Sequence, residues 1–113
     1  MNENAHLDMD ALSELREVMG EEFNVLLKTF INDSAQRIDT LRMALNSQDA
    51  DALGKAAHSF KGSSMNIGAT QLGQLCLKAE TAGRQGDLSG VESVIEGIAE
   101  EFSQVRDLLE AMS

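Results

Sequence analysis

The chain has 113 residues, of which 19 are acidic and nine are basic, so its formal net charge is −10 at pH 7. A surface of that sign repels nucleic acid and anionic membranes, and neither is expected as a partner. The single cysteine, Cys76, excludes an internal disulfide and a thiolate cluster, so a reducing cytoplasm is the expected setting. No segment reaches the ~20 apolar residues that are needed to span a bilayer.

The lack of proline and the clustering of turn-forming residues favour long helices over strands. A short leader helix is expected to be capped by Asp8 or Asp10 and to end near Gly20. A long second helix should follow to about Asn46. Its inward stripe is spaced by three or four residues: Phe23, Leu27, Phe30, Ser34, Ile38, Leu41 and Leu45.

Two shorter helices are expected in the middle of the chain. The first should start at Asp49 or Asp51 and stop near Gly68. The second should be capped by Thr70 and end at a break over residues 83–86. Its apolar stripe consists of Leu72, Leu75, Cys76 and Ala79. Cys76 lies on this stripe, so we interpret it as a small buried hydrophobe and not as a redox group.

The last helix is expected to open at Asp87, and it has the strongest periodicity in the chain. Apolar residues recur there three and four apart: Leu88, Val91, Ile95, Ile98, Phe102, Val105, Leu109 and Met112. This spacing suits antiparallel packing in a four-helix bundle, and the short connections at 46–50 and 83–87 favour the same arrangement. We therefore predict an all-α fold, an antiparallel four-helix bundle with a short N-terminal leader helix. Residues 1–113 should form a single domain, with residues 1–6 flexible.

One imidazole, that of His58, lies in the middle of the third predicted helix. At about 100° per residue, the apolar side of this helix lies opposite His58, which should face solvent or a partner. The surface neighbours of His58 three and four residues away are Gly54, Lys55, Lys61 and Gly62. A glycine inside a helix costs about 1 kcal/mol relative to alanine. Two glycines beside the imidazole therefore need another reason, such as the close approach of a second protein.

Other polar residues have simpler explanations. His6 should belong to a frayed terminus, and it is too far from His58 in the sequence to suggest a metal site with it. Ser64 points inward, where a small residue permits close helix packing, and Ser63 lies at the flank of the helix; a structural role is favoured for both. An isolated His58 would be interpreted as an ordinary surface histidine.

His58 is not isolated, however. It begins a spaced run, His58-x-x-Lys61-Gly62-x-Ser64-x-x-Ile67-Gly68-Ala69, which is followed by Leu72, Cys76 and Glu80. This run resembles the signature of histidine-containing phosphotransfer (HPt) domains. The resemblance implies that His58 receives a phosphoryl group from the aspartyl phosphate of a receiver domain and passes it to another receiver aspartate.

The chemistry of the residues is consistent with this resemblance. Imidazole changes charge near neutral pH, and its neutral form is a nucleophile. Lys61, one turn away from His58, can attract the equatorial oxygens of the phosphoryl group. By analogy with the family, Glu80 would accept a hydrogen bond from Nδ1–H of His58 and fix its tautomer. Five residues are candidates for partner access and binding: Gly54, Lys55, Gly62, Ser63 and Arg84.

We therefore predict a monomeric phosphoryl carrier with little catalytic machinery of its own. Its partners would be the receiver domains of a hybrid sensor kinase and of a response regulator. No cofactor of its own is expected, and Mg²⁺ and the acceptor aspartate should come from the receiver. One alternative is a helical adaptor that binds signalling partners without being phosphorylated, although it would not need His58, Lys61 and Gly62. Another is a module cut from a larger hybrid kinase; Met1 and the lack of a linker favour a complete protein.

Overall fold

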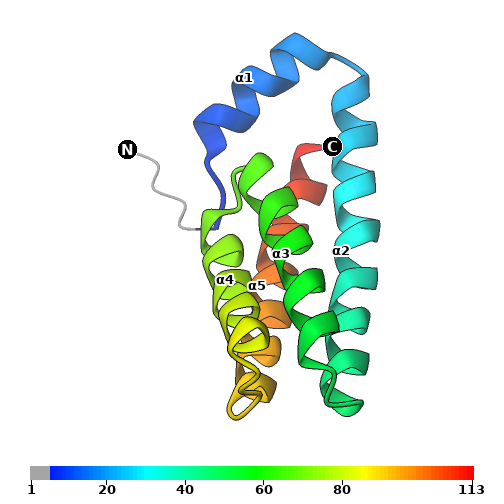
Figure 1. The fold of residues 1–113 in the computed structure, drawn as a ribbon. Coiled ribbons are helices and arrows are strands. Elements are labelled where there is room, and N and C mark those ends of the chain that lie inside the picture. The colour runs from blue at the N-terminus through cyan, green and yellow to red at the C-terminus, as the bar shows by residue number, and fades with distance from the viewer. Residues whose placement is uncertain (1–5) are drawn as a thin grey trace.

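A computed structural model describes residues 6–113. The prediction that residues 1–5 are flexible concerns residues outside this range. Within it the chain forms five helices and no strand: α1 (Met9–Met19), α2 (Glu22–Asn46), α3 (Ala50–Asn66), α4 (Thr70–Gln85) and α5 (Val91–Met112). Helices α2 to α5 form an antiparallel bundle, and α1 lies across one end of it (Figure 1). The prediction of a four-helix bundle with a leader helix is confirmed.

Two aspartates determine where helices begin. The Asp8 carboxylate accepts a hydrogen bond from the backbone N of Ala11 at 3.1 Å, and Asp49 accepts one from Ala52 N at 3.0 Å. Each carboxylate satisfies a backbone donor that the first turn leaves without a helical partner. Asp8 and Asp49 are therefore the caps of α1 and α3.

The boundaries of α4 and α5 correct two predictions. Thr70 is the first residue of α4 and not its cap, because Ala69 occupies the cap position without a side-chain hydrogen bond. Gly83 does not break α4, which continues to Gln85. The helix ends at Gly86, whose φ of +71° suits a residue without a side chain.

Asp87 does not open the last helix. Its carboxylate accepts a hydrogen bond from the backbone N of Ser89 at 3.1 Å, which forms a local turn, and α5 begins only at Val91 after Gly90. Leu88 therefore lies in the connection, where it is partly buried against the core. The loop between α4 and α5 is longer than the sequence suggested.

The core takes one stripe from each bundle helix. The α5 stripe is buried from Val91 to Leu109, as its periodicity predicts. On α2 the prediction holds as far as Leu41, beyond which Ala44 is buried and Leu45 only partly so. Cys76 is fully buried, and burial raises the pKa of its thiol to about 12. The interpretation of Cys76 as an inert core residue agrees with this environment.

The segment before α1 is held against the bundle. Leu7 is 2 % exposed, and the backbone N of Asp8 donates to the Gly68 carbonyl at 3.0 Å. His6 Nδ1 lies 2.7 Å from Oε2 of the buried Glu101 on α5. The prediction that His6 is frayed is wrong, because its contact with Glu101 of α5 holds it.

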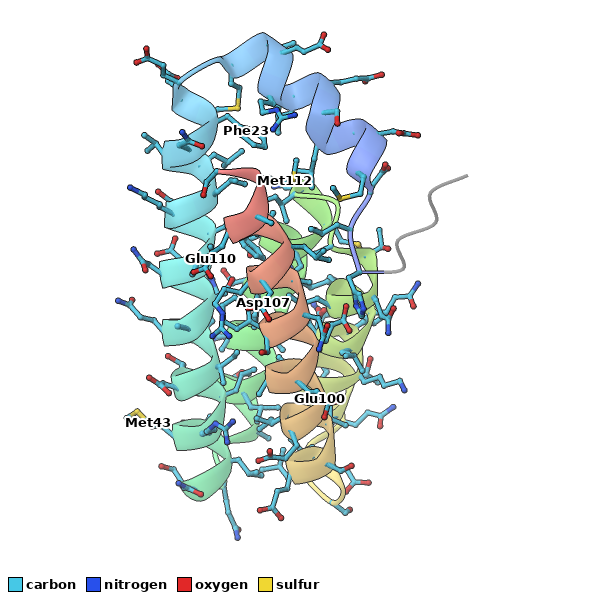
Figure 2. All side chains as sticks on the ribbon, turned by 180° about the vertical axis from the view of Figure 1, so that it is seen from behind. Phe23, Met43, Glu100, Asp107, Glu110 and Met112 are labelled. Carbon is cyan, nitrogen blue, oxygen red and sulfur yellow. The ribbon has the colours of Figure 1, made fainter. Side chains whose placement is uncertain are left out.

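The outer face of α5 is acidic. Figure 2 shows the side opposite to that of Figure 1, where the labelled carboxylates of Glu100, Asp107 and Glu110 lie along α5. All three are exposed. No helix in the described part of the chain has the length and apolar character needed to cross a membrane.

Candidate functional site

The candidate site lies where α3 and α4 pack against each other. His58 is in the middle of α3, and its side chain is 60 % exposed. Phe60, two residues further on, is fully buried, so the helix turns its apolar side inward and His58 outward. The prediction that His58 faces solvent is confirmed.

Glu80 on α4 is the centre of the site. Its side chain is only 3 % exposed, and its Oε2 lies 2.8 Å from Nδ1 of His58. The Nζ of Lys61 lies 2.8 Å from Oε1 of the same carboxylate, and Nη2 of Arg84 lies 2.6 Å from Oε2. One buried carboxylate therefore joins three basic side chains from two helices.

These contacts set the charge of Glu80. The hydrogen bond from Lys61 is the largest cause that lowers its pKa, burial opposes this, and the hydrogen bond from His58 and the charge of Arg84 lower it further. The carboxyl group is therefore ionised at neutral pH, and an ionised carboxylate can only accept hydrogen bonds.

It follows that Nδ1 of His58 carries a proton and donates a hydrogen bond to Glu80. In a neutral imidazole the other nitrogen, Nε2, then keeps its lone pair. Because the ring is largely exposed, this lone pair is available to an electrophile outside the protein. The arrangement of Glu80 and His58 is therefore suited to nucleophilic attack by Nε2.

The two cations are less free than the sequence suggested. Lys61 is 27 % exposed and Arg84 is 69 % exposed, yet both contact Glu80. Neither pair was predicted from the sequence, although the spacing of Glu80 and Arg84 by four residues within one helix could have indicated one of them. Both cations therefore lie close to the imidazole, on the same carboxylate.

The other predicted partner residues differ in their surroundings. Lys55 forms an exposed pair with Asp51 at 3.1 Å. The Ser63 hydroxyl donates to the Phe60 carbonyl at 3.1 Å within its own helix. Gly62 is exposed, and a Cβ built on it would have no neighbour within 4 Å. Gly62 thus leaves an open surface one turn from the imidazole.

Gly54 requires a correction. It is buried, and a Cβ built on it would lie 3.5 Å from Cα of Gly83 on α4. The prediction that Gly54 lies exposed beside His58 is wrong, because Gly54 is buried against Gly83 of α4. The close approach of the two glycines lies at the base of a hollow whose lining includes His58, Lys55 and Arg84.

No three histidine, cysteine or acidic side chains gather into a possible metal site within residues 6–113. The acidic residues of the described site are instead paired with cations, as Glu80 and Asp51 are.

Comparison with known proteins identifies the family. A family model described as "Hpt domain" matches residues 25–113, most of the chain. The chain belongs to the Hpt family. The Hpt chain is similar to a crystal structure of histidine-containing phosphotransfer protein B (HptB) from Pseudomonas aeruginosa PAO1. The two share 44 % identity over 95 % of this chain and 93 % of that one, with a TM-score of 0.91.

The Hpt chain is also similar to the sensor protein TorS of Escherichia coli (strain K12), with 31 % identity over 81 residues. This match covers 71 % of the chain and only 9 % of TorS. The resemblance stated from the motif is therefore confirmed at the level of the family. The protein has a histidine phosphotransfer role in phosphorelays, and Hpt domains work with the receiver domains of sensor kinases and response regulators. None of the matched proteins supports the adaptor alternative.

Proposed function

We propose that His58 is the residue that carries the phosphoryl group. The contact of its Nδ1 with the buried Glu80, 2.8 Å away, is the observation that carries this assignment. Nε2 would attack the phosphorus of an aspartyl phosphate. The bond from phosphorus to the aspartate oxygen breaks as the bond from Nε2 to phosphorus forms, and the aspartate leaves as a carboxylate.

The attack places positive charge on the imidazole ring, because Nδ1 keeps its proton. Glu80 would balance this charge through its hydrogen bond, and its fixed position avoids reorganisation during the reaction. Transfer to a second receiver is the same step in reverse, with a carboxylate of the receiver as the nucleophile. Glu80 is thus proposed as the residue that orients His58.

Lys61 and Arg84 are proposed to stabilise the negative charge of the phosphoryl group. Both lie on the Glu80 carboxylate that contacts His58, so they can reach a group on Nε2 by moderate side-chain rotation. In phosphoryl transfer the protein acts mainly by positioning and by electrostatic stabilisation. Lys55, Gly62 and Ser63 are proposed to contact the receiver, with Gly62 leaving room for it.

The partners of this step are proposed to be a receiver domain of a hybrid sensor kinase and a receiver domain of a response regulator. The receiver would supply Mg²⁺ and the aspartate, and the chain would act as a monomer without a cofactor of its own. Its net charge of −10 disfavours nucleic acid and membranes as partners, and its single buried thiol suits the cytoplasm.

The test is phosphorylation by a phosphorylated receiver domain. One phosphoramidate is expected, labile to acid and stable to base, and His58→Gln should abolish it. The matched control is His6→Gln, which should be labelled like the natural protein. Label that persists in His58→Gln, or that appears on serine, would contradict the assignment. Receiver binding without any label would instead favour the adaptor.

A further inference from the structure

Two glycines face each other where α3 and α4 cross. Gly54 lies four residues before His58 on α3, and Gly83 lies three residues after Glu80 on α4. Both are buried inside helices. Glycine is, after proline, the least favourable residue in a helix interior, so its presence at both positions needs a structural reason.

The two glycines are not equivalent. A Cβ on Gly83 would lie 2.6 Å from both Cα and N of Gly54, and 2.7 Å from the carbonyl oxygen of Ala50. These are backbone atoms of α3, which cannot rotate away. A Cβ on Gly54 would lie 3.5 Å from its nearest neighbours on α4, an ordinary van der Waals distance. Of the two glycines, Gly83 is therefore the one whose missing side chain allows the close approach of the two helices.

The crossing point is close to the candidate site. With a rise of 1.5 Å per residue, it lies about 4.5 to 6 Å along the helices from the pair of His58 and Glu80. A Cβ on Gly83 would need about 0.8 Å of extra separation to reach an ordinary contact of 3.4 Å. The 2.8 Å between His58 Nδ1 and Glu80 Oε2 would then approach 3.6 Å, beyond the range of an N–H···O hydrogen bond.

We propose that Gly83 is a positioning residue for phosphotransfer. By allowing α4 to approach α3, it holds the Glu80 carboxylate within hydrogen-bond distance of His58 and so fixes the proton on Nδ1. The effect on transfer rests on the proposed role of His58, whereas the effect on the geometry of the imidazole does not. Gly83 touches neither the phosphoryl group nor the partner in this scheme; it acts through Glu80.

The test is Gly83→Ala, with Gly73→Ala as the matched control. Gly73 is also a buried glycine of α4 that faces α3, but the three atoms nearest to a Cβ on it all belong to the Met65 side chain, with Cε at 2.7 Å, Sδ at 2.9 Å and Cγ at 3.1 Å. Met65 is 41 % exposed and flexible, so it can move aside. Both substitutions add one methyl group to α4 and change its helix propensity by the same amount.

Two measurements separate positioning from general packing. The ¹⁵N chemical shifts of the His58 ring report the position of the proton without any receiver domain present. In Gly83→Ala they should move towards a mixture of the two tautomers, and transfer per folded molecule should fall about tenfold, as expected for loss of an orienting hydrogen bond. In Gly73→Ala the ring shifts should be unchanged, and the rate should stay within about twofold of the natural protein.

Unchanged His58 ring shifts in Gly83→Ala would overturn the proposal, and so would equal changes in both variants. If the ring shifts and the transfer rate stay as in the natural protein while only the melting temperature falls, Gly83 is a packing residue and nothing more.

Should Gly83→Ala fold poorly, the same comparison is made in a Gly97→Ala background. Gly97 is on α5, and a Cβ there meets only Leu75 Cδ2, at 3.9 Å, so this substitution should stabilise the helix without touching the site. The ring shifts of His58 are measured without phosphorylation. If His58 were never labelled, the proposed function would fail, but the shift difference between Gly83→Ala and Gly73→Ala could still be observed. The two failures are therefore distinguishable.

Discussion

Within residues 6–113, two contacts join a histidine to a buried glutamate, and they have different surroundings. Nδ1 of His58 lies 2.8 Å from Glu80, and Nδ1 of His6 lies 2.7 Å from Glu101. The glutamate side chains are 3 % and 7 % exposed, respectively. The imidazole of His58 is 60 % exposed, whereas that of His6 is 33 % exposed. In the geometry of the contact alone, the two pairs are nearly the same.

The charges around the two pairs distinguish them. Glu80 also binds Lys61 and Arg84, at 2.8 Å and 2.6 Å. The hollow beside His6 is lined by Glu100 and Glu101 and, within residues 6–113, by no lysine or arginine. A phosphoryl group at His6 would face like charge, which is unfavourable at short range. On the proposed mechanism, an imidazole on a buried carboxylate is not sufficient for phosphotransfer, and the cations distinguish the His58 pair from the His6 pair.

The largest expected effect is that of removing a cation from the His58 site. Lys61→Ala should slow transfer from a phosphorylated receiver on the order of 10²-fold, as for the loss of one charged donor to the transition state. Transfer rates at saturating receiver measure this effect. Lys78→Ala is the control, because Lys78 is an exposed lysine of α4 outside the site.

Lys61→Ala should also reduce stability, in contrast to what an exposed lysine would do. Lys61 is mostly buried and binds a buried carboxylate, so its loss should cost about 1 kcal/mol, with Arg84 and His58 remaining on Glu80. Denaturant unfolding measures this difference. A rate equal to that of Lys78→Ala would remove Lys61 from the proposed mechanism, whatever the change in stability.

A smaller effect on the rate is expected when Glu80 loses its charge. In Glu80→Gln the amide oxygen can still accept from Nδ1, but it no longer balances the positive charge of the ring, so transfer should slow about 10- to 100-fold. Glu101→Gln changes the corresponding carboxylate of the His6 pair and should leave the rate unchanged. Equal loss of rate in both variants would show that the two pairs are not functionally different.

Glu80→Gln should also change how stability depends on pH. The pKa of Glu80 is lowered in the folded protein from its ordinary value of 4.5, chiefly by the hydrogen bond from Lys61. The folded state therefore gains stability from the ionised group above pH 4.5, and this gain is lost as the pH falls through the lower folded value. The natural protein should be more stable than Glu80→Gln at pH 7, and the difference should shrink below pH 4.5 in unfolding measured across that range. Glu100→Gln is the control, because it changes an exposed carboxylate. It should lose stability at acid pH as the natural protein does.

The smallest expected effect is that of filling the open surface beside His58. Gly62→Gln should weaken receiver binding about tenfold, because a long side chain would stand in the contact surface. Folding should be equal or more stable, since the change removes a glycine from the interior of a helix and meets no neighbour. Titration with the receiver and thermal unfolding measure the two quantities. Binding at the natural affinity would show that the receiver does not cover this part of α3.

Local spacing was sufficient to predict much of the fold and part of the site. The stripe of α5 and the outward direction of His58 follow from helical periodicity, which depends only on neighbours along the chain. Local chemistry narrowed the caps to Asp8 or Asp10 and to Asp49 or Asp51, and the structure selects Asp8 and Asp49. The predictions of a cap at Thr70 and of a helix start at Asp87 were wrong. Residue types that cap helices also occur just inside helices and in turns, and composition alone does not separate these positions.

Contacts between distant residues could not be predicted from spacing. His6 and Glu101 are 95 residues apart, and nothing near either residue indicates the other. Glu80 was reached only through the resemblance to HPt domains, because its partner His58 lies on another helix. Gly83 was interpreted as part of a helix break, since a glycine near a helix end usually marks a stop. Its role depends on the backbone of α3, which no pattern within α4 contains.

The burial of Cys76 allows its thiol to report unfolding of the bundle. Its thiol is fully inaccessible, and a pKa of about 12 leaves almost no thiolate at neutral pH, so alkylating reagents should not modify the native protein. Modification then requires opening of the bundle, and the labelling rate reports the fraction of open molecules. Cys76 is the only cysteine, so the mass that an alkylating reagent adds to any of the variants above comes from this residue. The labelling therefore compares the folding of the variants without a fluorophore or an engineered residue.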